Sequence, residues 1–158
     1  MSNKPLRSPA MTRRFLLLDA HNMIFADAEL SALHRRHPAA ARERLIRIFQ
    51  RHQDASGTRV VIVFDGSRAS RPSEIGTDTA GVQVIYAPSG QSADTVIERL
   101  ALKYASTHAL TVATNDHLVR TAAAAAGAES IDLETLRGEI EQSAKELDQT
   151  LDRLKRSK

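Results

Sequence analysis

The sequence contains no cysteine and no tryptophan, and aromatic residues make up only 4% of its 158 positions. The absence of cysteine excludes disulfides and thiolate metal sites, and it agrees with a reducing compartment such as the cytoplasm. No apolar run approaches the roughly 20 residues that span a bilayer, so we expect no membrane partner. The histidines show no metal-ligand spacing, and no glycine-rich phosphate loop is present. The scarcity of aromatic rings disfavours a base-stacking platform, so we expect any nucleic acid to be recognised through its backbone and shape, or with the help of a partner.

The remaining composition is typical of a globular protein. Hydrophobic residues make up 42% and charged residues 26%, and the length suits one domain with a sizeable core. The net charge of +3 is a mild bias toward anionic partners. We expect a disordered basic leader over residues 1–12, one domain over 13–145, and a charged, solvated helix end over 146–158.

Apolar runs alternate with amphipathic segments along the chain. The predicted strands cover residues 13–19, 59–65, 82–86, 110–113 and 130–131. The predicted helical segments cover residues 24–34 (a short helix or loop), 39–55, 92–107, 114–127 and 133–155, and a polar, basic loop covers residues 67–80. This order predicts an α/β fold, a three-layer α/β/α sandwich with a mostly parallel central sheet. Phe25, Phe49 and Phe64 are expected to pack inside, and Tyr104 lies on a predicted buried stripe.

Four aspartates are predicted to meet at one edge of this sheet. Asp19 and Asp65 end the first two strands, while Asp94 and Asp116 lie in the first turns of helices that follow the next two. The carboxyl ends of parallel strands share one edge, where α/β folds bind ligands. Asp94 and Asp116 also lie in line with the apolar stripes of their helices, so both should point inward. Crowded carboxylates need a compensating cation, and hard oxygen ligands suit Mg²⁺ or Mn²⁺.

Neighbouring polar residues could support this acidic centre, although each also has a simpler explanation. Asn22 could orient a carboxylate or bind a phosphate oxygen, and Thr114 and Asn115 supply polar groups beside the fourth aspartate. Glu98 follows Asp94 by one helical turn and could hold a metal-bound water or form an exposed salt bridge. Any one of the four aspartates could be only a helix cap, favoured by the helix dipole. A metal site is the better explanation of all four together.

Four short motifs are similar, in order and spacing, to those of NYN domains in the PIN-like nuclease superfamily. They are Leu18-Asp19-Ala20-His21-Asn22, Val63-Phe64-Asp65-Gly66, Ser92-Ala93-Asp94 and Ala113-Thr114-Asn115-Asp116. The resemblance is to the YacP-like branch, which has a ribosome-associated endoribonuclease, and it covers residues 13–145. It implies a PIN-like sandwich and a divalent-metal ribonuclease. It also implies that the aspartates of these motifs form the acidic centre, with Asn22 supporting the first. The family often has Gly and an aromatic residue where Ala20 and His21 stand here.

Basic residues must surround an acidic centre if it is to accept RNA, because the carboxylates repel phosphates. The candidate RNA contacts are Arg42 and Arg44 at the start of the second long helix, Arg68 and Arg71 in the loop after Asp65, and His21 and Ser92 beside the acids. Arginine contacts with phosphate give affinity without sequence choice. A solvated helix face explains Arg44 about equally well.

The leading interpretation is a cytoplasmic, divalent-metal-dependent endoribonuclease that acts through four aspartates, with RNA as substrate and the ribosome as a further partner left open. The alternative is a non-catalytic RNA- or ribosome-binding module with the same fold. A small phosphatase or nucleotide-binding domain ranks third, because the phosphate loop such domains often use is missing.

Overall fold

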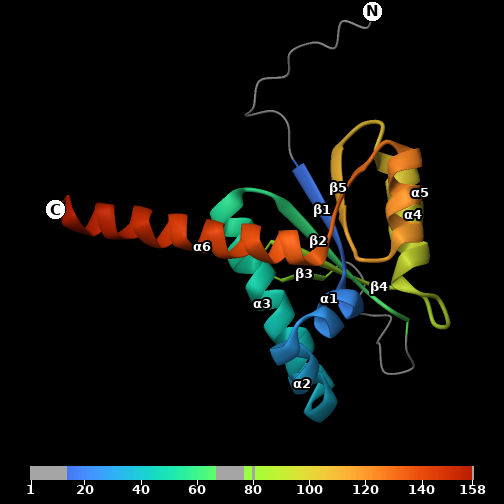
Figure 1. Cartoon of the computed structure of the whole chain (residues 1–158), viewed down its shortest axis with the longest axis horizontal. Helices are drawn as coiled ribbons and strands as arrows, with labels where there is room; N and C mark the ends of the chain where they lie inside the picture. The colour runs from blue at the N-terminus through green and yellow to red at the C-terminus, as the bar shows by residue number, and fades with distance from the viewer. Residues whose placement is uncertain (1–13, 67–76, 80, 158) are drawn as a thin grey trace, which may run out of the picture.

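The central sheet is described in a computed structural model that covers residues 14–66, 77–79 and 81–157 (Figure 1). Its strands are β1 (Arg14–Asp19), β2 (Arg59–Phe64), β3 (Thr77–Thr79), β4 (Val82–Tyr86), β5 (Ala109–Ala113) and β6 (Glu129–Ile131). They lie in the order β3-β4-β2-β1-β5-β6. Only the edge strand β3 is antiparallel to its neighbour; the other described pairs are parallel. The predicted mostly parallel α/β fold is confirmed.

Helices cover both faces of the sheet, because the strands are apolar on both sides. The helices are α1 (Ala20–Ala26), α2 (Ala28–Arg36), α3 (Pro38–Ser56), α4 (Ala93–Tyr104), α5 (His117–Ala126) and α6 (Leu133–Arg156). Leu16 and Leu18 of β1 belong to the core that includes residues of α1, α2, α3 and α6. Leu17, between them, belongs to the opposite core with residues of α4 and α5. This alternation along one strand gives the three layers of the sandwich.

Cap residues mark several helix ends. The Ser92 hydroxyl accepts a hydrogen bond from the Thr95 amide and begins α4. Asp132 caps α6 in the same way. Gly127 ends α5 with a left-handed φ of 95°, a conformation that is strained for residues with a Cβ. Side-chain hydrogen bonds therefore set the two helix starts, and a left-handed glycine sets the end of α5.

The segment after β1 differs from the prediction. The short helix or loop expected over residues 24–34 is two helices, which meet at Asp27. The Asp27 carboxylate accepts hydrogen bonds from the amides of Glu29 and Leu30 and so begins α2. This break interrupts the helical period on which the prediction for Phe25 depended. Phe25 is 60% exposed rather than packed inside.

The other predictions about packing and loops have mixed outcomes, and some of them concern residues that the structure does not describe. Phe49 and Phe64 are buried as expected, but Tyr104 is 38% exposed, because it lies in the last turn of α4. The predicted loop over 67–80 contains β3, and its residues 67–76 and 80 lie outside the described residues, as does the predicted leader over 1–12. No helix in the described part of the chain is long and apolar enough to cross a membrane.

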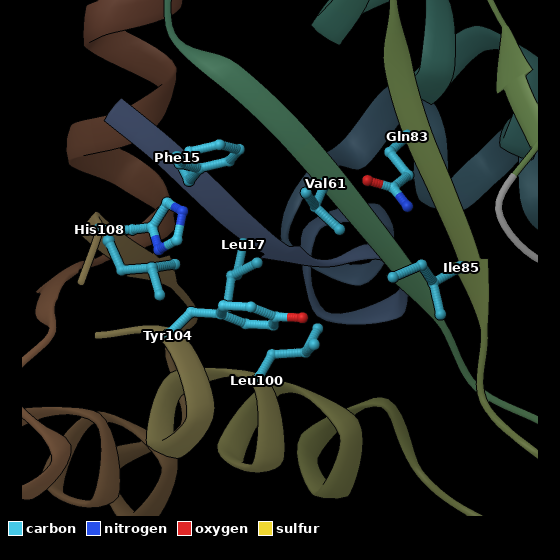
Figure 2. A pocket seen from close by; sticks show the side chains of 9 residues that line it. Phe15, Leu17, Val61, Gln83, Ile85, Leu100, Tyr104 and His108 are labelled. Atoms are coloured by element: carbon cyan, nitrogen blue, oxygen red, sulfur yellow. The ribbon is translucent and has the colours of Figure 1, made fainter. Parts of the chain in front are cut away.

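A cavity of about 290 Å³ lies between α4 and the sheet (Figure 2). It is lined by side chains from β1, β2, β4, β5, the second half of α4 and the turn between α4 and β5, namely Phe15, Leu17, Val61, Gln83, Ile85, Leu100, Tyr104, His108 and Leu110. None of the predicted site residues lines it. The site predicted from the sequence is therefore separate from this cavity.

Candidate acidic site at the carboxyl edge of the sheet

Asp19 lies where the buried strand β1 passes directly into α1. It is 7% exposed, and its Oδ1 accepts a hydrogen bond of 3.2 Å from the Asn22 amide, which begins the helix. The pKa of Asp19 is raised from 3.8 to about 7, chiefly by burial. The nearby carboxyl of Asp94 and the negative charge of Asp65 contribute to this rise, while the hydrogen bond from the Asn22 amide opposes it. Asp19 is therefore a buried acid held among other acids.

Asp94 lies in α4, one of the helices that cover the sheet, and it acts on Asp19 at the end of β1. It is half-buried in the first turn of α4, which the Ser92 cap begins after the turn that follows β4. Asp19 lies close enough to Asp94 for that carboxyl to raise its pKa, so Asp19 is only partly ionised near pH 7 unless a positive charge lies beside it.

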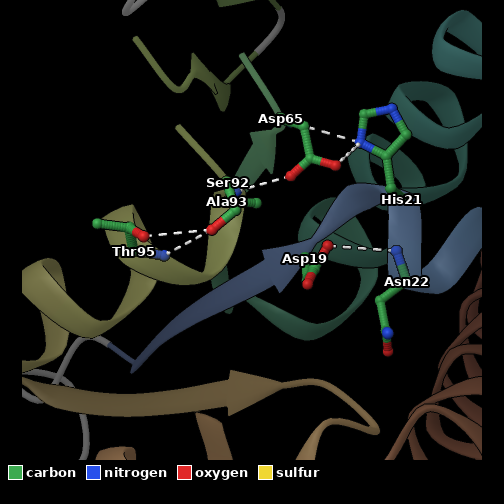
Figure 3. A network of polar contacts seen from close by, with 7 residues as sticks. All are labelled: Asp19, His21, Asn22, Asp65, Ser92, Ala93 and Thr95. Atoms are coloured by element: carbon green, nitrogen blue, oxygen red, sulfur yellow. Dashed lines mark hydrogen bonds and ion pairs between the residues drawn. The ribbon is translucent and has the colours of Figure 1, made fainter. Parts of the chain in front are cut away.

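Asp65 adds a third carboxylate just after β2. One of its oxygens accepts a hydrogen bond of 2.7 Å from the Ala93 amide at the N-terminus of α4, a position that favours negative charge (Figure 3). Its other oxygen lies 3.2 Å from Nδ1 of His21. Gly66 fixes the chain here, because a Cβ at this position would overlap the carbonyl oxygen of Pro88. The close approach of the two backbones keeps Asp65 beside α4.

His21 lies on the first turn of α1, between Asp65 and a group of aromatic rings. The amide of Asp65 donates to its Nδ1 at 3.3 Å, and the ring of Phe64 lies edge-to-face with it at 5.9 Å. Burial lowers the pKa of His21, the nearby Asp65 carboxylate raises it, and the charge of Arg42 lowers it. His21, one of the predicted RNA contacts, therefore lies beside one of the predicted acids, and the charge of Arg42 acts on it.

Asp116, the fourth predicted acid, serves as the N-cap of α5. Its Oδ1 accepts hydrogen bonds from the amides of Leu118 at 2.9 Å and Val119 at 3.4 Å. The carboxylates that raise the pKa of Asp19 are Asp94 and Asp65. Asp94 belongs to α4, and Asp65 follows β2, which lies on the opposite side of β1 from β5. Among the described residues, the structure thus brings three of the predicted acids into electrostatic contact and places the fourth at the neighbouring strand end.

The predicted supporting residues tie the strand ends together. Asn22 orients Asp19 through its backbone amide, while its side-chain oxygen accepts a hydrogen bond of 2.9 Å from the Asn115 amide. The side chain of Asn115 in turn accepts from the Leu133 amide. Thr114 is fully buried, and its hydroxyl accepts from the Asp116 amide. These contacts link β1, the end of β5 and the start of α6 at the acidic edge.

The remaining predicted residues are placed as follows. The guanidinium of Arg44 lies 3.7 Å from the carboxylate of Glu29, and both side chains are largely exposed. Glu98 is half-buried on α4 one turn after Asp94, and Ser92 caps that helix. Arg68 and Arg71 lie outside the described residues. Sequence reasoning did not mark Arg137 of α6, which pairs with Asp27 at 3.6 Å and holds the end of α1.

The donor set at this edge has the chemistry that a hard divalent cation prefers. Asp19, Asp94 and Asp65 offer carboxylate oxygens, and burial together with the neighbouring carboxyl groups raises the pKa of Asp19. A bound cation would favour the ionised form of Asp19. Within residues 14–66, 77–79 and 81–157, however, no group of three or more His, Cys, Asp or Glu side chains is arranged to hold a metal ion.

Comparison with known families agrees with this fold and this ordered set of motifs. The profile of the YacP-like NYN domain matches residues 16–158. The chain belongs to the YacP-like NYN domain family. Comparison with curated proteins finds no match.

Two crystal structures of Rae1 (YacP) from Bacillus subtilis are similar to this YacP-like NYN domain. One is 28% identical in sequence, with a TM-score of 0.75 over 90% of this chain and 82% of the other. The second, a W164L mutant, is 27% identical, with a TM-score of 0.74 over 89% of this chain and 82% of the other. The family and its PIN-like nuclease fold, which the motifs predicted, are confirmed.

Proposed function

We propose that this protein is a divalent-metal-dependent endoribonuclease whose centre is the acidic edge of the sheet. One observation carries the proposal: Asp19 is buried, and the neighbouring carboxyl groups of Asp94 and Asp65 both raise its pKa. A fold stabilised only by packing gains nothing from burying carboxyl groups together, since their desolvation and repulsion cost free energy. Membership of the YacP-like NYN family, with its resemblance to ribonucleases, supports a catalytic reason for this arrangement.

Asp19, Asp65, Asp94 and Asp116 would hold one or two Mg²⁺ or Mn²⁺ ions. Such an ion activates water and stabilises charge on a phosphoryl group. In the proposed reaction the water oxygen forms a bond to phosphorus and the bond from phosphorus to the 3′ oxygen breaks. One carboxylate accepts the proton of the water, and the leaving 3′ oxygen gains a proton. The products would carry 5′-phosphate and 3′-hydroxyl ends.

The substrate would approach from the side of α1 and α3. His21 lies beside Asp65, and Arg42 is close enough to lower the pKa of His21. Positive charge beside carboxylates allows a phosphate to come near them. RNA is the proposed substrate in the cytoplasm, and the ribosome is a proposed partner.

The test is cleavage of end-labelled RNA by the purified full chain, with structured and unstructured RNA and with translating ribosomes. Asp94→Asn should lower the rate by about 100-fold or more, as loss of a group that stabilises a transition state does. It should keep the circular dichroism spectrum of the wild type. Asp148→Asn, at an exposed carboxylate of α6, is the matched control and should cleave normally. Full activity of Asp94→Asn, or of the wild type in excess EDTA, would refute the mechanism.

A non-catalytic RNA- or ribosome-binding module is the second candidate. Two observations favour it: no group of three or more potential metal ligands among the described residues, and the engagement of Asp116 as a helix cap. RNA binding without cleavage in Mg²⁺ or Mn²⁺ would select this function.

A further inference from the structure

Phe25 is an aromatic ring that the fold leaves in solvent. It is 60% exposed, whereas Phe49 and Phe64 are at most 1% exposed. It lies near the end of α1, the short helix that begins at the buried Asp19. Exposed aromatic rings contribute little to folding, but they offer a large rigid surface to a ligand at a low cost in side-chain entropy.

The segment that carries Phe25 is held in place by α6 and α2. Arg137 of α6 donates a hydrogen bond of 2.9 Å to the carbonyl of Ala26, the residue after Phe25, and pairs with Asp27. The ring of His34 on α2 lies 5.4 Å from the Phe25 ring at an interplanar angle of 88°. Phe25 is therefore exposed on a fixed corner between two helices, where a ligand would not have to order it.

The exposed ring is continuous with the acidic edge through His21. Phe25 and His21 are one helical turn apart on α1, and their ring centroids are 6.2 Å apart at an angle of 32°. His21 in turn lies 3.2 Å from an oxygen of Asp65, and Figure 3 shows its ring directed toward that carboxylate. A ligand that covers Phe25 therefore lies beside the site proposed for the scissile phosphate.

Basic side chains occur on α2 and α3, the helices that pack against α1. Arg35 and Arg36 are exposed in the last turn of α2, next to His34. Arg42 of α3 is half-buried close to His21. Proteins bind single-stranded nucleic acid with aromatic rings that stack on bases and with arginines that contact phosphates.

We propose that Phe25 is a base-stacking site for an unpaired RNA nucleotide next to the phosphate that is cleaved. The inference rests on the proposed function and specifies its substrate as RNA that is single-stranded at this position. Bases within an RNA helix are stacked on one another, so a nucleotide must be unpaired to reach the ring. The few aromatic residues of this chain thus include one placed where a base could use it.

The binding test uses the full chain carrying Asp94→Asn, so that the RNA stays intact, and short unstructured RNAs with one 2-aminopurine at successive positions. Phe25→Ala should weaken binding roughly 5- to 150-fold, the usual effect of losing one base stack. Phe25→Trp should bind about as tightly as the parent. Phe25→Leu, which keeps apolar bulk without a ring, should bind like Phe25→Ala. Leu102→Ala, at an exposed apolar residue of α4, is the matched control and should bind normally.

An abasic nucleotide moved along the RNA locates the stacked base. At one position the loss of the base should weaken binding by the same factor as Phe25→Ala, and combining the two changes should weaken it no further. Wild-type affinity in Phe25→Ala or Phe25→Leu would overturn the inference, as would equal binding of a fully paired duplex. If the protein with Asp94 restored cleaves RNA but substitution of Phe25 does not change RNA binding, only this inference fails. If it neither binds nor cleaves RNA, the proposed function fails with it.

Discussion

Replacing Asp19 by Asn should make the protein more stable while abolishing its proposed activity. The pKa of Asp19 is raised from 3.8 to about 7, chiefly by burial, so the folded protein binds this proton more tightly than the unfolded chain. Asparagine has a similar shape, and its oxygen can still accept the hydrogen bond from the Asn22 amide. Its amide group can also donate to Asp94 without the shared proton. The substitution therefore removes the cost of ionisation and keeps the local contacts.

The size of the effect follows from the pKa values. Each pKa unit corresponds to about 1.4 kcal/mol, so ionising Asp19 in the folded state costs up to roughly 4 kcal/mol. Below pH 3.8 the carboxyl is protonated in both states and contributes no difference. As pH rises toward 7 the unfolded chain loses the proton first, so the stability of the wild type falls, and the full cost is present above pH 7. The variant does not titrate at this position.

The assay is urea denaturation of wild type and Asp19→Asn in EDTA at several pH values between 4 and 9. The free energies of unfolding should be similar near pH 4, and the variant should be the more stable by up to about 4 kcal/mol above pH 8. Asp148→Asn, on the exposed end of α6, should show no such pH-dependent difference. A difference between wild type and Asp19→Asn that stays constant or shrinks as pH rises would refute the assignment of a buried, protonated acid.

Two contacts at the same edge give further predictions. Gly66→Ala should lower the free energy of unfolding by about 1–3 kcal/mol, because its Cβ would overlap a backbone carbonyl; Gly138→Ala, where a Cβ meets nothing, should not. Asn22→Ala should cost about 0.5–1.5 kcal/mol and slow RNA cleavage, because the Asn115 amide loses its protein acceptor. Gln142→Ala, at an exposed amide of α6, is the control for that variant in denaturation and cleavage assays. Wild-type stability of Gly66→Ala or Asn22→Ala would contradict the corresponding contact.

Much of the acidic site follows from sequence because topology constrains it. Long apolar runs identify β1 and β2 as strands buried on both faces, and alternation with helices implies parallel pairing. Parallel strands joined by right-handed crossovers end at the same edge, so aspartates at those ends come together. This argument needs no knowledge of side-chain packing. It predicts that Asp19, Asp65 and Asp94 lie near one another, and in the structure Asp65 and Asp94 both act on the pKa of Asp19.

Contacts between distant segments were decided only by the tertiary structure. Asn22 bonds to a backbone amide 93 residues away, and Arg137 holds the end of α1 from 111 residues further along the chain. The exposure of Phe25 depends on the break at Asp27, where a carboxylate caps a new helix and the apolar period is interrupted. Periodicity within a segment tells which of its faces is apolar, because it depends on local geometry. The distant group that a side chain contacts depends on how the helices pack, and this packing cannot be read from the residues around that side chain in the sequence.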